Sequence, residues 1–166
     1  MMDFQDNEPS SRRQISGRRL GREWAMQILY KLDASQQTAI GQDEWTLLFE
    51  LIMQLEDDDI PAHLRREGKK RARYLVENIC EKLSEIDSLI IPHLQNWTME
   101  RLDTLDRALL RLCCFEMLFD AIPPPVAIDE ALNLARRYTN GKSNAAFLNG
   151  VLDSIRKEHI QNKGRT

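Results

Sequence analysis

The segment from Arg18 to Leu32, with the sequence RRLGREWAMQILYKL, constrains the fold of this chain more than any other stretch. On a helix of about 3.6 residues per turn, Leu20, Trp24, Ile28 and Leu32 fall on one broad apolar arc. An arc of this width has to be buried against other elements. We therefore predict a core helix here, around which the rest of the chain packs.

The border of this apolar arc is cationic. Arg18 and Arg22 lie one helical turn apart on it, and Arg19, Met26 and Tyr30 continue round the same side. We expect an exposed strip that begins with guanidinium groups and ends with an aromatic ring. Such a strip suits phosphates and bases together. The alternative is the solvated face of an ordinary core helix.

Positive charge is concentrated near the start of the chain. Five arginines and no acidic residue lie between positions 12 and 22, although the whole chain has a net charge of −3. This asymmetry favours a polyanionic partner. Residues 1–17 have little to bury, so we predict a disordered basic arm whose Arg12 and Arg13 fold onto a ligand.

The remaining sequence predicts an all-α fold. Valine occurs at only three positions, whereas leucine, alanine, glutamate, arginine and glutamine are common, which favours helix over sheet. Apolar spacing predicts further helices over residues 44–56, 61–83, 84–94, 99–119, 126–138 and 143–155. Ser84 with Asp87 fits a capping box, and Ser143 can cap the last helix. We divide the chain into subdomains 18–83 and 84–160 and a tail, 161–166.

Residues that carry catalytic or metal chemistry are scattered. Cys80, Cys113 and Cys114 have no C-x-x-C spacing, and no histidine has a cysteine or carboxylate at ligand spacing. We therefore expect reduced, inert thiols and neither a metal site nor a cofactor. No apolar run approaches the roughly 20 residues that span a bilayer, and no secretory signal precedes the first helix, so we expect a cytoplasmic protein. Trp97 is predicted to plug the core.

Several segments, in this order, resemble the NusB family of bacterial transcription antitermination factors. They are RRLGREWAMQILYKLD, IDSLIIPHLQNW, RLDTLDRALLRLCCFEML, IPPPVAIDEALNLARRY and FLNGVLDSI. The resemblance covers most of the chain from Arg18 to Ile155, whereas residues 35–70 match poorly. It implies two packed helical bundles with about seven helices, and boxA RNA and ribosomal protein NusE as partners.

The resemblance also implies which residues meet RNA. By motif match these are Arg18, Arg19, Arg22, Gln27 and Tyr30 on the first helix, and Arg111, Phe147 and Asn149 further on. Spacing alone favours the core for Phe147, a buried backbone contact for Asn149 and close helix approach at Gly150. Gly21 stands where the family often has alanine, and glycine costs about 1 kcal/mol in a helix interior, so the helix start should be looser.

For the NusE surface, the resemblance points to Asp106, Arg107 and Glu116. An acidic face would suit a basic ribosomal protein. The alternative is that Asp103 simply pairs with Arg107 along one helix.

Together these observations predict a non-enzymatic adaptor. It would bind boxA-type single-stranded RNA with NusE, in the transcription elongation complex, while ribosomal RNA operons are transcribed. One alternative is an RNA-binding helical domain related to that of rRNA methyltransferases, although no glycine-rich cofactor loop or catalytic cysteine motif follows the helical region. Another is a protein-only helical scaffold. A homodimer stays open, because amphipathic helices bury their stripes equally well within one chain or between two.

Overall fold

The computed structural model describes residues 15–56, 59–139 and 144–163. These residues form seven α-helices and two short 3-10 helices, with no β-strand among them, which confirms the all-α prediction. The elements are α1 (Gly17–Ala34), α2 (Gln42–Leu55), α3 (Ala62–Glu81), α4 (Leu83–Ile90), η1 (Ile91–His93), η2 (Met99–Arg101), α5 (Thr104–Leu118), α6 (Pro124–Tyr138) and α7 (Ala145–Lys163). The predicted arm with Arg12 and Arg13 lies outside the described residues.

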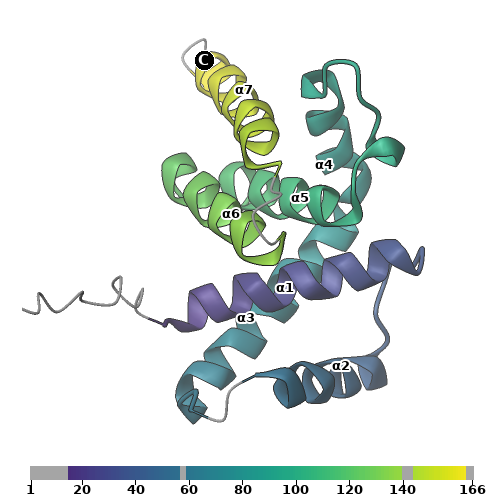
Figure 1. Cartoon of the computed structure of the whole chain (residues 1–166), viewed down its shortest axis with the longest axis vertical. Coiled ribbons are helices and arrows are strands. Elements are labelled where there is room, and N and C mark those ends of the chain that lie inside the picture. The colour runs from purple at the N-terminus through teal and green to yellow at the C-terminus, as the bar shows by residue number, and fades with distance from the viewer. Residues whose placement is uncertain (1–14, 57–58, 140–143, 164–166) are drawn as a thin grey trace, which may run out of the picture.

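Helices α1 and α3 cross at very close range in the first bundle (Figure 1). Glycines line the crossing on both helices. A Cβ atom on Gly21 would lie 2.5 Å from the Cβ of Arg71, and one on Gly68 would lie 2.6 Å from the ring of Trp24. The missing side chain at Gly21 is what lets α3 approach, while the looser helix start stays a prediction. Trp24 is fully buried at this crossing, as its spacing predicted.

Helix α2 lies to one side of the α1–α3 pair (Figure 1). Its aromatic residues meet the basic side of α3, where the Lys69 ammonium lies 5.8 Å from the Phe49 ring centre and the Arg73 guanidinium lies 5.3 Å from that of Trp45. A cation that lies over an aromatic face is attracted to the ring. Lys69 and Arg73 of α3 therefore help to hold α2 in place.

Helix α5 is the centre of the second bundle and contacts α4, α6 and α7; α4 and α7 lie above it in the view of Figure 1. Most of its side chains are buried. The single helix predicted over 99–119 is divided, because Leu102 and Asp103 are extended between η2 and α5. The Arg107 side chain donates hydrogen bonds to the carbonyl oxygens of Met99 and Leu102, which satisfies the backbone at this break.

Two further boundary predictions differ from the structure. Ser84 does not cap α4, because α4 already begins at Leu83, directly after α3. The predicted tail is partly wrong, because α7 continues to Lys163. Ser143 lies outside the described residues.

None of the described helices combines the length and apolar character that crossing a membrane requires.

Candidate nucleic-acid interface

The three predicted RNA-contacting arginines of α1 lie in three different environments. Arg18 is exposed, Arg19 is half-buried, and Arg22 is buried with only 5% of its surface exposed. The prediction that Arg22 and Met26 belong to an exposed strip is therefore wrong, because both face the interior. The helical wheel placed them on the border of the apolar arc, and the second bundle covers that border.

Arg22 belongs to a largely buried ionic cluster, made of Arg22, Arg71, Glu116 and Asp120, with Glu116 at its centre. The Nε and Nη2 atoms of Arg22 donate to the two carboxylate oxygens of Glu116, at 2.8 and 2.9 Å. Arg71 donates to Glu116 at 3.0 Å and also to Asp120. The cluster joins α1, α3 and the end of α5. Glu116 is fully buried, so neither Glu116 nor Arg22 is open to a partner in this conformation.

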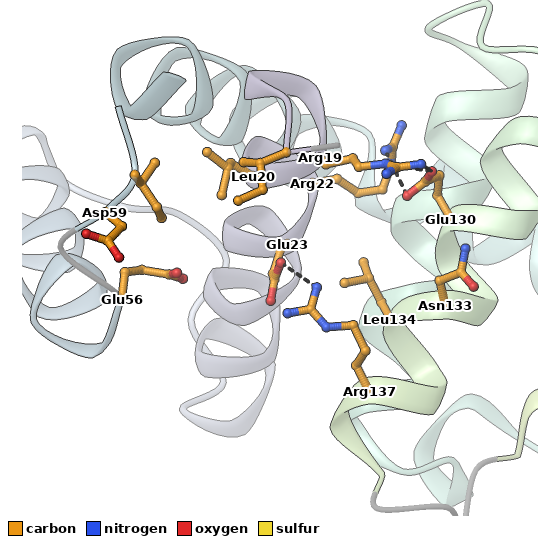
Figure 2. A pocket seen from close by; sticks show the side chains of 12 residues that line it. Arg19, Leu20, Arg22, Glu23, Glu56, Asp59, Glu130, Asn133, Leu134 and Arg137 are labelled. Atoms are coloured by element: carbon orange, nitrogen blue, oxygen red, sulfur yellow. Dashed lines mark hydrogen bonds and ion pairs between the residues drawn. The ribbon is translucent and has the colours of Figure 1, made fainter. Parts of the chain in front are cut away.

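Arg19 instead joins α1 to α6 at the surface. Its Nε and Nη2 atoms donate to one carboxylate oxygen of Glu130, at 3.1 and 2.9 Å, while part of the side chain stays exposed (Figure 2). The cavity beside this pair has a volume of about 620 Å³ and a lining that contains three arginines and four carboxylates. With that balance of charge it is not a phosphate cradle.

A network of hydrogen bonds continues from Arg19 along the line where α1 meets α6. We call this line the α1–α6 seam; it consists of Arg19, Glu23, Gln27 and Tyr30 from α1 and of Glu130, Arg137 and Tyr138 from α6. The Tyr138 hydroxyl donates to Glu23 at 2.6 Å and accepts from Gln27 at 2.8 Å. Arg137 donates to the other oxygen of Glu23 at 2.9 Å (Figure 2).

Two aromatic rings of the seam reach solvent. Tyr30 is 48% exposed and Tyr138 is 41% exposed. Tyr30 lies one helical turn beyond Gln27, so it is on the same face of α1. Burial of the hydroxyl, and then its hydrogen bond to the Glu23 carboxylate, raise the pKa of Tyr138, so it stays a neutral phenol. Sequence reasoning missed Tyr138, although two arginines directly before it repeat the basic and aromatic pattern of α1.

At the far end of α1, Asp33 gathers two of the predicted site arginines. Its carboxylate accepts from Nε and Nη2 of Arg107, at 2.9 and 2.6 Å, and from Nη1 of Arg111, at 2.8 Å. Arg111 also donates to Asp87 on α4. Burial opposes ionisation of Asp33, but these hydrogen bonds outweigh it and lower the pKa of the carboxyl. The alternative in which Arg107 pairs with Asp103 is wrong.

The remaining predicted partner residue, Asp106, is also buried. It accepts a 2.8 Å hydrogen bond from Nδ2 of Asn144, directly before α7. Burial raises the pKa of the Asp106 carboxyl, although the bond from Asn144 acts against this. Of the three residues predicted to form the NusE surface, only Arg107 keeps part of its side chain accessible.

The predicted residues of α7 face different ways. Phe147 is half-buried and packs on the core, with its ring centre 6.3 Å from that of Trp97. Asn149 is exposed and points away from Phe147, because residues two apart on a helix do not share a face. The structural alternative for Asn149 is therefore wrong. So is the one for Gly150, where an added Cβ would have no other atom within 4 Å.

Neither a reactive thiol nor a metal cluster stands out in this region. Burial raises the pKa of Cys114 to about 12 and that of Cys113 well above its usual value, in keeping with inert thiols. No group of three or more histidine, cysteine, aspartate or glutamate side chains could hold a metal ion within the part of the chain that the structure describes.

Comparison with known proteins gives a consistent family. The sequence profile of the NusB family matches residues 19–157. The transcription antitermination protein NusB of Solibacter usitatus is 38% identical over 144 residues, which cover 87% of this chain and 91% of that protein. The corresponding protein of Elusimicrobium minutum is 32% identical, covering 87% and 96%.

Solved structures of the same family share the fold. A NusB structure from T. maritima is 31% identical with a TM-score of 0.62, and the match covers 85% of this chain and 91% of that one. A crystal structure of NusB and NusE in complex with double-stranded RNA contains a chain that is 25% identical, with a TM-score of 0.67 and coverage of 86% and 97%. From the profile match, these identities and the shared fold, we conclude that this chain belongs to the NusB family.

Proposed function

We propose that this protein is a non-enzymatic transcription antitermination factor that binds boxA-type single-stranded RNA together with ribosomal protein NusE. The observation that carries the proposal is the α1–α6 seam. It places the half-exposed Tyr138 ring 5.9 Å from the accessible Arg137 guanidinium, and it has the half-exposed Tyr30 on the face of α1 that also carries the partly accessible Arg19. Single-stranded RNA is typically held in this way, with cations along its backbone and rings against its unstacked bases.

The family relationship supports the same function. The relatives that match over most of their length are named transcription antitermination proteins, and a structural neighbour was solved with NusE and RNA. The RNA in that neighbour is double-stranded. We favour a single strand for this chain, because the bases of a duplex stack on one another and leave no free face for a tyrosine ring.

For RNA, we propose that Arg18, Arg19, Gln27 and Tyr30 make direct contacts and that Tyr138 completes this surface. Arg22 supports it from inside, by fixing α1 against α5 through Glu116. Arg111 holds Asp33 and Asp87 in the same supporting way. Phe147 and Asn149 face different directions, so an RNA strand that meets both has to pass round the start of α7.

For NusE, we propose a contact on the second bundle close to Arg107, within the transcription elongation complex of the bacterial cytoplasm. Asp106 and Glu116 act there as supporting residues, because both are buried. Asp106 holds Asn144 and the start of α7 against α5, and Glu116 fixes α5 to α1 and α3.

An electrophoretic mobility experiment tests the proposal. Labelled boxA RNA and a scrambled RNA of the same composition are titrated with the protein, with and without NusE. We expect tighter binding of boxA RNA and a further gain when NusE is added. Equal binding of both RNAs, unchanged by NusE, would contradict the proposal and favour the protein-only scaffold.

A further inference from the structure

Trp97 differs from the other two tryptophans of this chain. Trp24 and Trp45 are buried, whereas Trp97 is 52% exposed, so the prediction that it plugs the core is wrong. An indole ring contributes much of its stabilising energy through burial. Trp97 therefore gains less from burial than the other two tryptophans, and about half of its surface is free for a ligand.

The backbone around Trp97 holds the ring at the surface. Asn96, directly before it, has a φ of 66°, and the N–H of Trp97 donates to the carbonyl of Leu94 at 3.0 Å. Leu94 on one side and Met99 on the other are buried. The carbonyl of Met99 also accepts a 2.9 Å hydrogen bond from Arg107. Trp97 thus sits at the tip of a turn that is anchored at both ends.

Phe147 supports the indole from the side. The two ring centres are 6.3 Å apart and the ring planes are inclined by 58°. Phe147 itself packs on the core, so the edge of the pair is fixed from below. With 52% of its surface exposed, Trp97 stays open to solvent beside this contact.

The neighbours of Trp97 indicate what would cover its exposed surface. Gln95, Asn96 and Thr98, on both sides of Trp97 in the chain, are exposed and polar, and the nearest exposed large apolar residue along the chain is Ile91 in η1. An apolar protein side chain would bury its surface against a wider apolar patch than this. A nucleobase has an apolar face and a polar edge, which matches one ring surrounded by amide and hydroxyl groups.

We propose that Trp97 and Phe147 form an aromatic platform on which one unpaired base of a bound single-stranded RNA stacks. This inference rests on the proposed RNA-binding function and adds a second stacking site to the α1–α6 seam. The two sites are connected through Arg107, which bonds Asp33 at the end of α1 and the Met99 carbonyl behind Trp97.

The test combines protein variants with RNA that lacks single bases. The probe is a fluorescently labelled boxA oligoribonucleotide, and a series of copies each carries one abasic nucleotide. Trp97→Ala should weaken binding of the intact RNA about tenfold, whereas Trp97→Phe should keep most of the affinity. One abasic position should weaken binding to the wild-type protein by a similar factor and have little further effect on Trp97→Ala.

Ile91→Ala is the matched control, because Ile91 is a similarly exposed apolar residue in the neighbouring η1 and should not change RNA affinity. Circular dichroism and thermal unfolding establish that each variant is folded. Wild-type affinity of a folded Trp97→Ala variant for boxA RNA would overturn the platform and leave the proposed function intact.

A Trp97→Ala variant that loses affinity for NusE but not for RNA would also overturn the platform, because the ring would then be a protein contact. Failure of the wild-type protein to distinguish boxA from scrambled RNA would count against the proposed function itself.

Discussion

The two sides of α1 use the same kinds of side chain for different purposes. On the side toward α3 and α5, Arg22 is buried and bound to Glu116 through two hydrogen bonds. On the side toward α6, Arg19 pairs with Glu130 at the surface and Tyr30 stays half-exposed. The difference shows that a cation in a basic helix can be buried in the fold or stay partly accessible, and that the packing partner decides which.

The largest effect that separates the two sides should come from Glu116→Gln. This change removes the buried carboxylate that Arg22 and Arg71 share. Among the described residues, Arg71 then keeps only Asp120 as an ion-pair partner, and Arg22 keeps only the Glu130 carboxylate, at 3.8 Å. Breaking a buried ion pair typically costs about 3–5 kcal/mol, so the free energy of unfolding, measured with urea, should fall by about that amount. Lys157→Ala breaks an exposed pair with Asp153 and should cost less than about 1 kcal/mol. An equal loss of unfolding free energy in the two variants would mean that the buried cluster stabilises the fold no more than an exposed ion pair does.

Tyr30→Ala should show the opposite pattern, because its ring is half-exposed. We expect a loss of boxA RNA affinity of about tenfold, with the free energy of unfolding changed by less than about 0.5 kcal/mol. Fluorescence anisotropy and urea denaturation measure the two quantities. Tyr30→Phe should keep the affinity. If Tyr30→Ala instead unfolds the protein, the ring belongs to the interior side of the comparison.

Arg18→Ala should change the salt dependence of RNA binding. Each lost phosphate contact on a single strand lowers the slope of log affinity against log salt concentration by roughly 0.7. Arg22→Gln should leave this slope unchanged, because its guanidinium is turned inward. Titrations at several salt concentrations give both slopes. A lowered slope for Arg22→Gln would mean that the buried cluster opens when RNA binds.

The smallest effect should be a change in acid sensitivity through Asp33, at the end of α1. The pKa of the Asp33 carboxyl is lowered in the fold, so the stability that it contributes is fully present above the ordinary aspartate pKa of 3.8 and is lost as the pH falls through the lower pKa of the folded state. Asp33→Asn should remove this part of the dependence. Urea denaturation between pH 3 and pH 7 gives the comparison. An unchanged pH profile would place Asp33 outside the ionic network.

Local periodicity was enough to predict α1 and the burial of Trp24, because both depend on residues a few positions apart. The environment of Arg22 depends on Glu116, which lies 94 positions further along the chain, so no local pattern could reveal it. The prediction that Trp97 is buried in the core was wrong for a related reason. The stretch QNWT does not show that Asn96 adopts a positive φ, and this conformation holds the ring at the surface.

The sequence predicted the kinds of side chain in the candidate site better than it predicted which residues lie there. Tyr30, Gln27 and Arg19 do share one face, as helical spacing requires. Tyr138 joins them because α6 lies beside α1, which is a fact of tertiary structure. Asp106 and Glu116 look like surface charges in a helical sequence, yet α5 is surrounded by other helices and both carboxylates are buried.

The close crossing of α1 and α3 at their glycines limits which substitutions the chain can accept there. At Gly68, the width of a single methyl group separates the seated arrangement from one in which Trp24 is displaced. Because Trp24 is fully buried between α1 and α3, its displacement would disturb the packing of α1 on α3. A substitution at this buried crossing would thus be felt by α1, the helix that carries Arg19 and Tyr30 of the proposed RNA surface.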